Sequence, residues 1–133
     1  MPGDAYARRR MAISTVTVTF PASPEFLRLA RIATADAASR AGLDYEEIDD
    51  VRIAISELCS VVSVDALGTV TLSFEVQPGA LTVSGESATR AAAVTANELS
   101  QAIISAVVDE HTLDTDDGVT RFRVTKRARH ARA

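Results

Sequence analysis

Each stretch of this chain that is rich in β-branched residues alternates between apolar and polar side chains. The clearest case is residues 15–20, Thr-Val-Thr-Val-Thr-Phe, and the alternation returns at residues 70–76 and 119–126. Because successive side chains of a strand point to opposite faces of a sheet, strands of this kind bury only one face. The pattern therefore predicts a sheet with one covered face, which is the sheet of a two-layer architecture.

Residues 24–41 have the apolar spacing of a helix that could cover such a face. Ser23 is a candidate N-cap, Pro24 suits the first helical position, and Gly42 is a candidate C-cap. The apolar stripe is rich in alanine, which predicts close packing against a neighbour. Its members are Phe26, Leu29, Ala30, Ala33, Ala37 and Ala41.

Two further helices are predicted at residues 45–64 and 93–108. Asp44 followed by Glu47 resembles a capping box at the start of the first of these. Its apolar stripe consists of Ile48, Val51, Ile55, Cys59 and Val62. The inward residues expected for the later helix are Val94, Leu99, Ile103, Ile104 and Val107.

Turn residues divide the remaining strands. A Pro-Gly turn at 78–79 joins the strand at 70–76 to a second strand that opens at Leu81, and the small, polar residues 84–91 are expected to form a loop. Asp117-Gly118 lies between two strand-like runs at 111–115 and 119–126, which is a strong hairpin signal.

The element order predicts one α/β (α+β) two-layer sandwich. We expect a mixed, largely antiparallel sheet of about five strands, covered on one face by three helices. The domain is predicted to span residues 14–127, between a basic, disordered N-terminal tail at 1–13 and a basic C-terminal tail at 128–133.

Composition narrows the range of functions. The chain has 133 residues, a net charge of −4 and only 5% aromatic residues, so aliphatic side chains must build the core. The acidic balance argues against nucleic-acid binding, which requires a basic surface.

The cysteine content and the lengths of the apolar runs bear on the compartment. The single cysteine, Cys59, allows no internal disulfide and suits the cytoplasm, and no apolar run is long enough to cross a membrane. The isolated His111 and His130 indicate no metal or catalytic site.

The same order of elements resembles the ATP-binding domain shared by histidine kinases, gyrase-type ATPases and anti-sigma kinases. The segment FPASPEFLRLARIATADAASRAGLDYEEIDDVRIAISELCSVV, at residues 20–62, is similar to the opening of the anti-sigma branch, with Ala30-Arg31 in its first helix. The ending VVDEHTLDTDDGVTRFRVTKR, at residues 107–127, is similar to the last helix end and terminal hairpin of that branch. The resemblance covers most of residues 15–127.

The first ATPase motif of that family is Glu-x-x-x-Asn, which places both side chains on one face of a helix. In active members the glutamate is the general base and the asparagine binds Mg²⁺. Here Glu57 is present, but Val61 stands at the asparagine position and offers no oxygen to the cation. The resemblance thus assigns Glu57 as a vestigial general base, although it could equally be an exposed helix carboxylate.

The other nucleotide-binding motifs are also altered. In Asp-x-Gly-x-Gly, where the acid binds the adenine amino group, Gly85 stands for the aspartate and Ser87 and Thr89 for the glycines. Glu98 and Ser100 stand where a glycine pair would hold phosphate, and only residues 88–97 remain for the ATP lid. Thr120 in the terminal hairpin matches the family but is also an ordinary strand residue. We therefore predict that ATP and Mg²⁺ are lost as ligands and that no cofactor or metal site remains.

These features predict an anti-sigma-like regulatory protein that acts by protein–protein binding. Its expected partners are a sigma factor or an anti-anti-sigma (STAS-type) antagonist, and the family also suggests a homodimer. The resemblance assigns partner contact to Arg31, with Arg28 beside it, although both could be a solvated helix face. The alternative is an ATP-dependent serine kinase that phosphorylates the antagonist with Glu57 as base. A nucleic-acid accessory with basic tails is a third, weaker reading.

Overall fold

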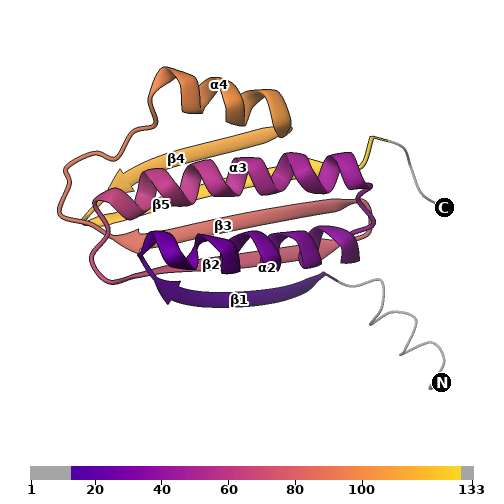
Figure 1. The fold of residues 1–133 in the computed structure, drawn as a ribbon, viewed down its shortest axis with the longest axis horizontal. Helices are drawn as coiled ribbons and strands as arrows, with labels where there is room; N and C mark the ends of the chain where they lie inside the picture. The colour runs from indigo at the N-terminus through magenta and orange to yellow at the C-terminus, as the bar shows by residue number, and fades with distance from the viewer. Residues whose placement is uncertain (1–12, 130–133) are drawn as a thin grey trace.

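The computed structural model describes residues 13–129, which form one five-stranded sheet and three α-helices (Figure 1). The sheet order is β1-β2-β3-β5-β4, and each pairing of neighbouring strands is antiparallel. The elements are β1 (Ser14–Pro21), the 3₁₀ turn η1 (Pro24–Phe26), α2 (Leu27–Arg40), α3 (Tyr45–Val64), β2 (Thr69–Gln77), β3 (Ala80–Ala88), α4 (Glu98–Val107), β4 (Glu110–Asp116) and β5 (Val119–Arg127).

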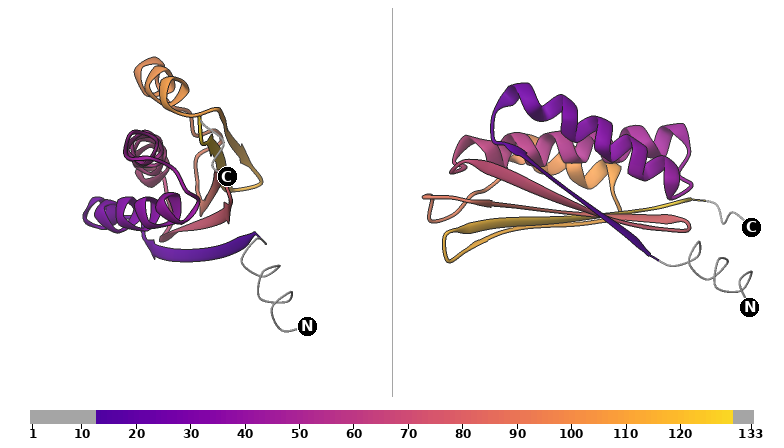
Figure 2. Two further views of the ribbon diagram at one scale, coloured as in Figure 1. Left: turned by 90° about the vertical axis from the view of Figure 1, so that its right-hand side faces the viewer. Right: turned by 90° about the horizontal axis from the view of Figure 1, so that it is seen from below.

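Within residues 13–129 the helices all lie on one face of the sheet, and no helix covers the other face, which we call the bare face (Figure 2). Alternation explains this arrangement, because Val70, Leu72 and Phe74 of β2 are buried under the helices. On the bare face, hydroxyl groups meet across the strands, as in the contact between Thr19 and Thr71 at 2.9 Å. The predicted two-layer α+β fold is confirmed.

Local sequence fixes the ends of α2. Gly42 has a φ of 85°, which an L-residue rarely adopts, and its N–H donates to Ser39 O while Leu43 N–H donates to Ala38 O. These two bonds form a Schellman motif that ends the helix one residue before Gly42, at the C-cap Ala41. At the other end, Ser23 caps the 3₁₀ turn through its backbone conformation, without a side-chain hydrogen bond.

The predicted capping box at the start of α3 is confirmed. Asp44 Oδ1 accepts from Glu47 N–H, and Glu47 Oε1 accepts from Asp44 N–H, both at 2.8 Å. The other Glu47 oxygen accepts from Arg129 N–H at 2.6 Å, so the described end of the chain is attached to this helix start. The tails expected at 1–13 and 128–133 otherwise lie almost wholly outside the described residues.

The predicted hairpins are present, but the loop predicted at 84–91 is wrong in its first half. Gly118 and Asp117 both have positive φ, as a two-residue type I′ turn requires. Residues 84–88 continue β3, because β5 pairs with them from Arg123 to Val119. Tertiary pairing thus overrides the weak strand propensity of Ser-Gly-Glu-Ser-Ala.

Helix α4 begins five residues later than predicted. Asn97 is its N-cap, and its Oδ1 accepts from Ser100 N–H at 2.8 Å. Residues 89–97 instead cross to α4 as an irregular segment, with Val94 and Ala96 buried. Leu99 was predicted to point inward but is 70% exposed, while Ile104 is buried as expected.

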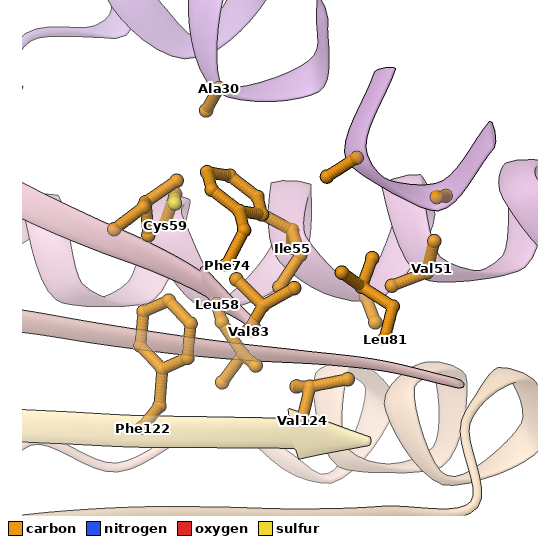
Figure 3. Packing of buried hydrophobic residues seen from close by; sticks show 14 of the residues in the cluster. Ala30, Val51, Ile55, Leu58, Cys59, Phe74, Leu81, Val83, Phe122 and Val124 are labelled. Atoms are coloured by element: carbon orange, nitrogen blue, oxygen red, sulfur yellow. The ribbon is translucent and has the colours of Figure 1, made fainter. Parts of the chain in front are cut away.

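Aliphatic and alanine side chains fill the space between the layers, with Phe74 and Phe122 among them (Figure 3). Ala30 of α2 and Ile55 and Cys59 of α3 are buried in this core. Within residues 13–129, no helix has the length and apolar character needed to cross a membrane.

Candidate functional site

Glu57 lies in the middle of α3 and faces α4. Its Oε2 accepts a hydrogen bond from the Ser100 hydroxyl at 2.9 Å, and Ser100 is itself only 9% exposed. The cap at Asn97 holds Ser100 in the first turn of α4. The carboxylate that the family resemblance assigns as a base is therefore bound by a side chain of its own domain.

Val61 follows Glu57 by one helical turn and is half-buried. Its side chain offers no oxygen, and the described residues contain no group of three or more His, Cys, Asp or Glu side chains that could hold a metal ion. Because Mg²⁺ takes only oxygen ligands in near-octahedral geometry, the residues at this position do not fit the cation.

Gly85 faces the helix layer at the position predicted for the adenine-binding acid. It pairs directly with Phe122 of β5, whose ring covers the glycine. A Cβ built on Gly85 would lie 2.3 Å from two ring carbons of Phe122, far inside van der Waals contact. The site as folded thus has no room for an aspartate, and the residues do not fit the adenine of ATP.

Ser87 and Thr89 stand at the two positions predicted for glycines, and both are buried. Ser87 Oγ donates to Thr69 O at 2.7 Å, and Thr89 Oγ1 donates to Asp65 O at 3.0 Å. Each hydroxyl therefore satisfies a backbone carbonyl of the domain. Side chains bonded within the domain thus stand at the two positions where the family pattern has glycines that allow a ligand to approach the backbone.

The segment at 89–97 that stands for the ATP lid is attached to the sheet. Val94 N–H donates to Thr115 Oγ1 at 3.0 Å, and Thr115 contacts Thr120 Oγ1 at 3.2 Å. Thr120, the family-like threonine, is fully buried and thus serves this internal network. Glu98 lies in the first turn of α4, where its negative charge would repel a phosphate.

Arg31, predicted to contact a partner, lies in a hollow between α2 and α3. Its Nε donates to Ser56 Oγ at 2.8 Å, which fixes the guanidinium against α3. The hollow has a volume of about 460 Å³ and is lined by Arg31, Asp49, Arg52, Ile53, Ser56 and Glu57. Arg28 is exposed on the same helix but does not line the hollow.

Some of the exposed apolar side chains of the domain also lie on these two helices. Ile32 of α2 is 59% exposed, and Leu29 and Ile53 are 42% and 43% exposed. Arg52 lines the hollow together with Ile53, and one of its guanidinium nitrogens lies 3.1 Å from Asp49 Oδ1. We call the surface formed by Arg28, Leu29, Arg31, Ile32, Arg52 and Ile53 the α2–α3 surface.

The sequence analysis did not identify three features of the site. The first, the Asn97 cap of α4, had a local sequence signal, since asparagine is a preferred N-cap residue. The other two, the contact of Ser100 with Glu57 and that of Phe122 with Gly85, join residues far apart in the chain and had no local sequence signal.

Cys59 was expected to be an inert core residue, and its burial raises the pKa of the thiol to about 12. His111 is half-buried in β4, and His130 lies outside the described residues.

Comparison with known proteins gives matches in sequence and in fold. No protein-family model matches the chain. Serine-protein kinase RsbW of Halalkalibacterium halodurans is 37% identical over 65 residues, which cover 47% of this chain and 40% of that protein. Serine-protein kinase RsbW of Listeria monocytogenes is 48% identical over 42 residues, covering 32% of this chain and 27% of that protein. The chain thus spans less than half the length of these curated relatives.

The solved structure of the RsbU and RsbW domains of a Mycobacterium tuberculosis protein superposes with a TM-score of 0.66. The superposition covers 90% of this chain and 34% of that one, at 20% sequence identity, and therefore shows a shared fold. The sequence matches to serine-protein kinases RsbW bear out the resemblance to the anti-sigma branch, and the structural match bears out its fold.

Proposed function

We propose that this chain is an anti-sigma-like regulator that acts by protein–protein binding and does not bind ATP. The observation that carries this proposal is the 2.9 Å hydrogen bond from Ser100 to Glu57, which occupies the base carboxylate within the domain. Val61 removes the metal ligand one turn away. Without Mg²⁺, phosphoryl transfer lacks its main means of charge neutralisation.

The α2–α3 surface supports protein binding as the retained activity. Arginine is enriched among the hot spots of protein interfaces, and the exposed Leu29, Ile32 and Ile53 offer apolar area that a partner can bury. Arg31 is already oriented by Ser56, so less side-chain entropy is lost when a partner binds it. We propose a sigma factor or a STAS-type antagonist as the partner, with an acidic side chain facing Arg31, and a cytoplasmic location that follows from such partners. A homodimer is a further proposal from the family resemblance.

The alternative function is a serine kinase acting on the antagonist. It is favoured by the name serine-protein kinase that the sequence relatives bear, and by the retention of Glu57. For that function, the Ser100 contact would have to open and another oxygen donor would have to replace the asparagine at position 61.

The proposal is tested by measuring partner binding with and without nucleotide. The immobilised chain is titrated with candidate sigma factors and STAS-type antagonists of its own organism by surface plasmon resonance. We expect binding that Mg-ATP leaves unchanged and that Arg31→Ala weakens by about tenfold or more. Arg123→Ala on the bare sheet face is the matched control and should bind like the parent chain. Binding that requires Mg-ATP, or equal losses in both variants, would contradict the proposal.

A further inference from the structure

We propose that the outer edge of β4 accepts a basic, extended segment of a partner protein as a sixth strand of the sheet. β4 is one of the two outermost strands and pairs with β5. Within residues 13–129, no backbone–backbone hydrogen bond joins β4 to any other element. Such an edge presents a row of N–H and C=O groups that an added strand can bind. This second surface does not depend on the proposed function.

Acidic side chains line this edge on the bare face of the sheet. Glu110, Asp114 and Asp116 are all exposed, and they share this face because they alternate along β4. Glu110 already forms an ion pair with β5, whereas neither aspartate forms one within the described residues. Arg121, the cross-strand partner of Asp114, instead pairs with Glu86 of β3 at 3.4 Å. The two aspartates are therefore available to basic side chains of an added strand.

On the helix side, the same edge borders a hollow between β4, α4 and the segment at 89–97. The hollow has a volume of about 250 Å³, and His111 and Leu113, which alternate with the acidic residues, line it from β4. Its apolar lining also includes Leu58, Val94 and Ile104. Because successive side chains of a strand point to opposite faces, every second side chain of an added strand would be directed towards this hollow. Apolar residues are expected at those positions.

The two sides of the edge together define the sequence pattern of the partner. Basic residues at alternate positions would lie opposite Asp114 and Asp116, and the apolar residues between them would face the hollow. A second copy of β4 is a poor occupant, because its own acidic residues would face those of the first. β1, the other outer strand, has no charged residue between Ser14 and Pro21 and so cannot select by charge. The β4 edge thus fits an alternating basic and apolar segment of another protein.

Fluorescence anisotropy with the labelled peptide Lys-Val-Lys-Val-Lys-Val-Lys tests the proposal on the full chain. We expect saturable binding that Asp114→Asn/Asp116→Asn weakens about fivefold, because two cross-strand charge pairs are lost. The matched control, Glu25→Gln/Asp36→Asn, removes the same formal charge at exposed positions of η1 and α2 and should bind like the parent chain. Equal weakening in both double variants would show a response to net charge alone and would overturn the proposal.

Backbone N-methylation of the peptide tests whether it binds as a strand. Alternate residues of a strand direct their N–H groups to opposite edges, so methylating one alternate set should abolish binding and methylating the other should leave it largely unchanged. Equal effects of the two sets would overturn strand addition. In NMR spectra, the peptide should shift the amide signals of β4, and shifts confined to β1 or to the α2–α3 surface would contradict the assigned edge.

Sedimentation of the chain with and without the peptide tests for a competing occupant. We expect the peptide to leave the oligomeric state unchanged. A dimer that the peptide disperses would assign the β4 edge to a second copy of this chain and would overturn the proposal. The outcome is separable from that of the proposed function, because Arg31→Ala on the α2–α3 surface should leave peptide binding unchanged whether or not a sigma factor or antagonist binds.

Discussion

Lys126 of β5 makes the best-buried ion pair of the described residues, and its removal gives a quantitative test of how α4 is held. Its Nζ donates to Asp50 Oδ2 of α3 at 3.1 Å and to Val107 O at the end of α4 at 2.8 Å. The side chains of Lys126 and Asp50 are only 10% and 23% exposed. We consider Lys126→Met, which keeps most of the apolar stem and removes the charge.

The expected loss of stability in Lys126→Met arises mainly from the carboxylate of Asp50, which remains without its partner. Removing one partner of a fully buried ion pair costs about 3–5 kcal/mol, because the other charge remains buried without compensation. Asp50 is partly hydrated, so we expect the free energy of unfolding to fall by about 2–3 kcal/mol. This figure includes the hydrogen bond from Lys126 to the Val107 carbonyl, which is also lost. For a domain of this size, that corresponds to a fall in Tm of roughly 10 °C.

The assay is chemical denaturation with Arg127→Met as the matched control. Arg127 is the next residue along and pairs with Glu110, but both side chains are more than half exposed, at 54% and 65%. Exposed pairs contribute about 0–1 kcal/mol, so the control should lose little. A Lys126→Met variant no less stable than Arg127→Met would refute the reasoning.

Two further predictions concern the core and the contact at Glu57. The pKa of the Cys59 thiol is about 12 in the folded chain, against an ordinary value of 9.0, so above pH 9 the unfolded chain releases a proton that the native state keeps. The free energy of unfolding should therefore fall by about 1.4 kcal/mol per pH unit in that window, and Cys59→Ala should lack this slope in denaturation curves; equal slopes would contradict the assignment. Ser100→Ala should lower the free energy of unfolding by about 1–2 kcal/mol, because it removes the hydrogen bond to Glu57. The control, Ser105→Ala at an exposed position of the same helix, should cause no loss. Equal stabilities of the two variants would show that the hydrogen bond contributes little.

The parts of the fold that depend on neighbours in sequence were predictable. The alternation in β1, the Asp44–Glu47 capping box and the turn at Gly118 each act within a few residues. The extension of β3 to Ala88 was not predictable, because its polar residues become strand only when β5 pairs with them. The start of α4 was placed too early because Ala93 and the apolar spacing that begins at Val94 favour a helix locally, while the hydrogen bond from Val94 N–H to Thr115 ties the segment to β4.

The candidate site divides in the same way. That position 61 offers no oxygen to a cation can be read from the sequence alone, because it depends on the chemistry of the Val61 side chain. The manner in which the site is filled depends on Ser100 and Phe122, which lie more than 30 residues from Glu57 and Gly85 in the chain. The resemblance indicated which residues of the family motifs are absent from the sequence. Which side chains contact Glu57 and Gly85 instead depends on the packing of the folded chain.

The central claim, that this domain does not bind ATP, is tested most directly by isothermal titration calorimetry with Mg-ATP. We predict no binding heat up to about 1 mM nucleotide, which corresponds to a binding free energy weaker than about −4 kcal/mol. Val61→Asn should be equally silent, because it restores the metal ligand while Phe122 and Ser100 still fill the site. Micromolar, magnesium-dependent binding by the unaltered chain would contradict the account and favour the serine kinase.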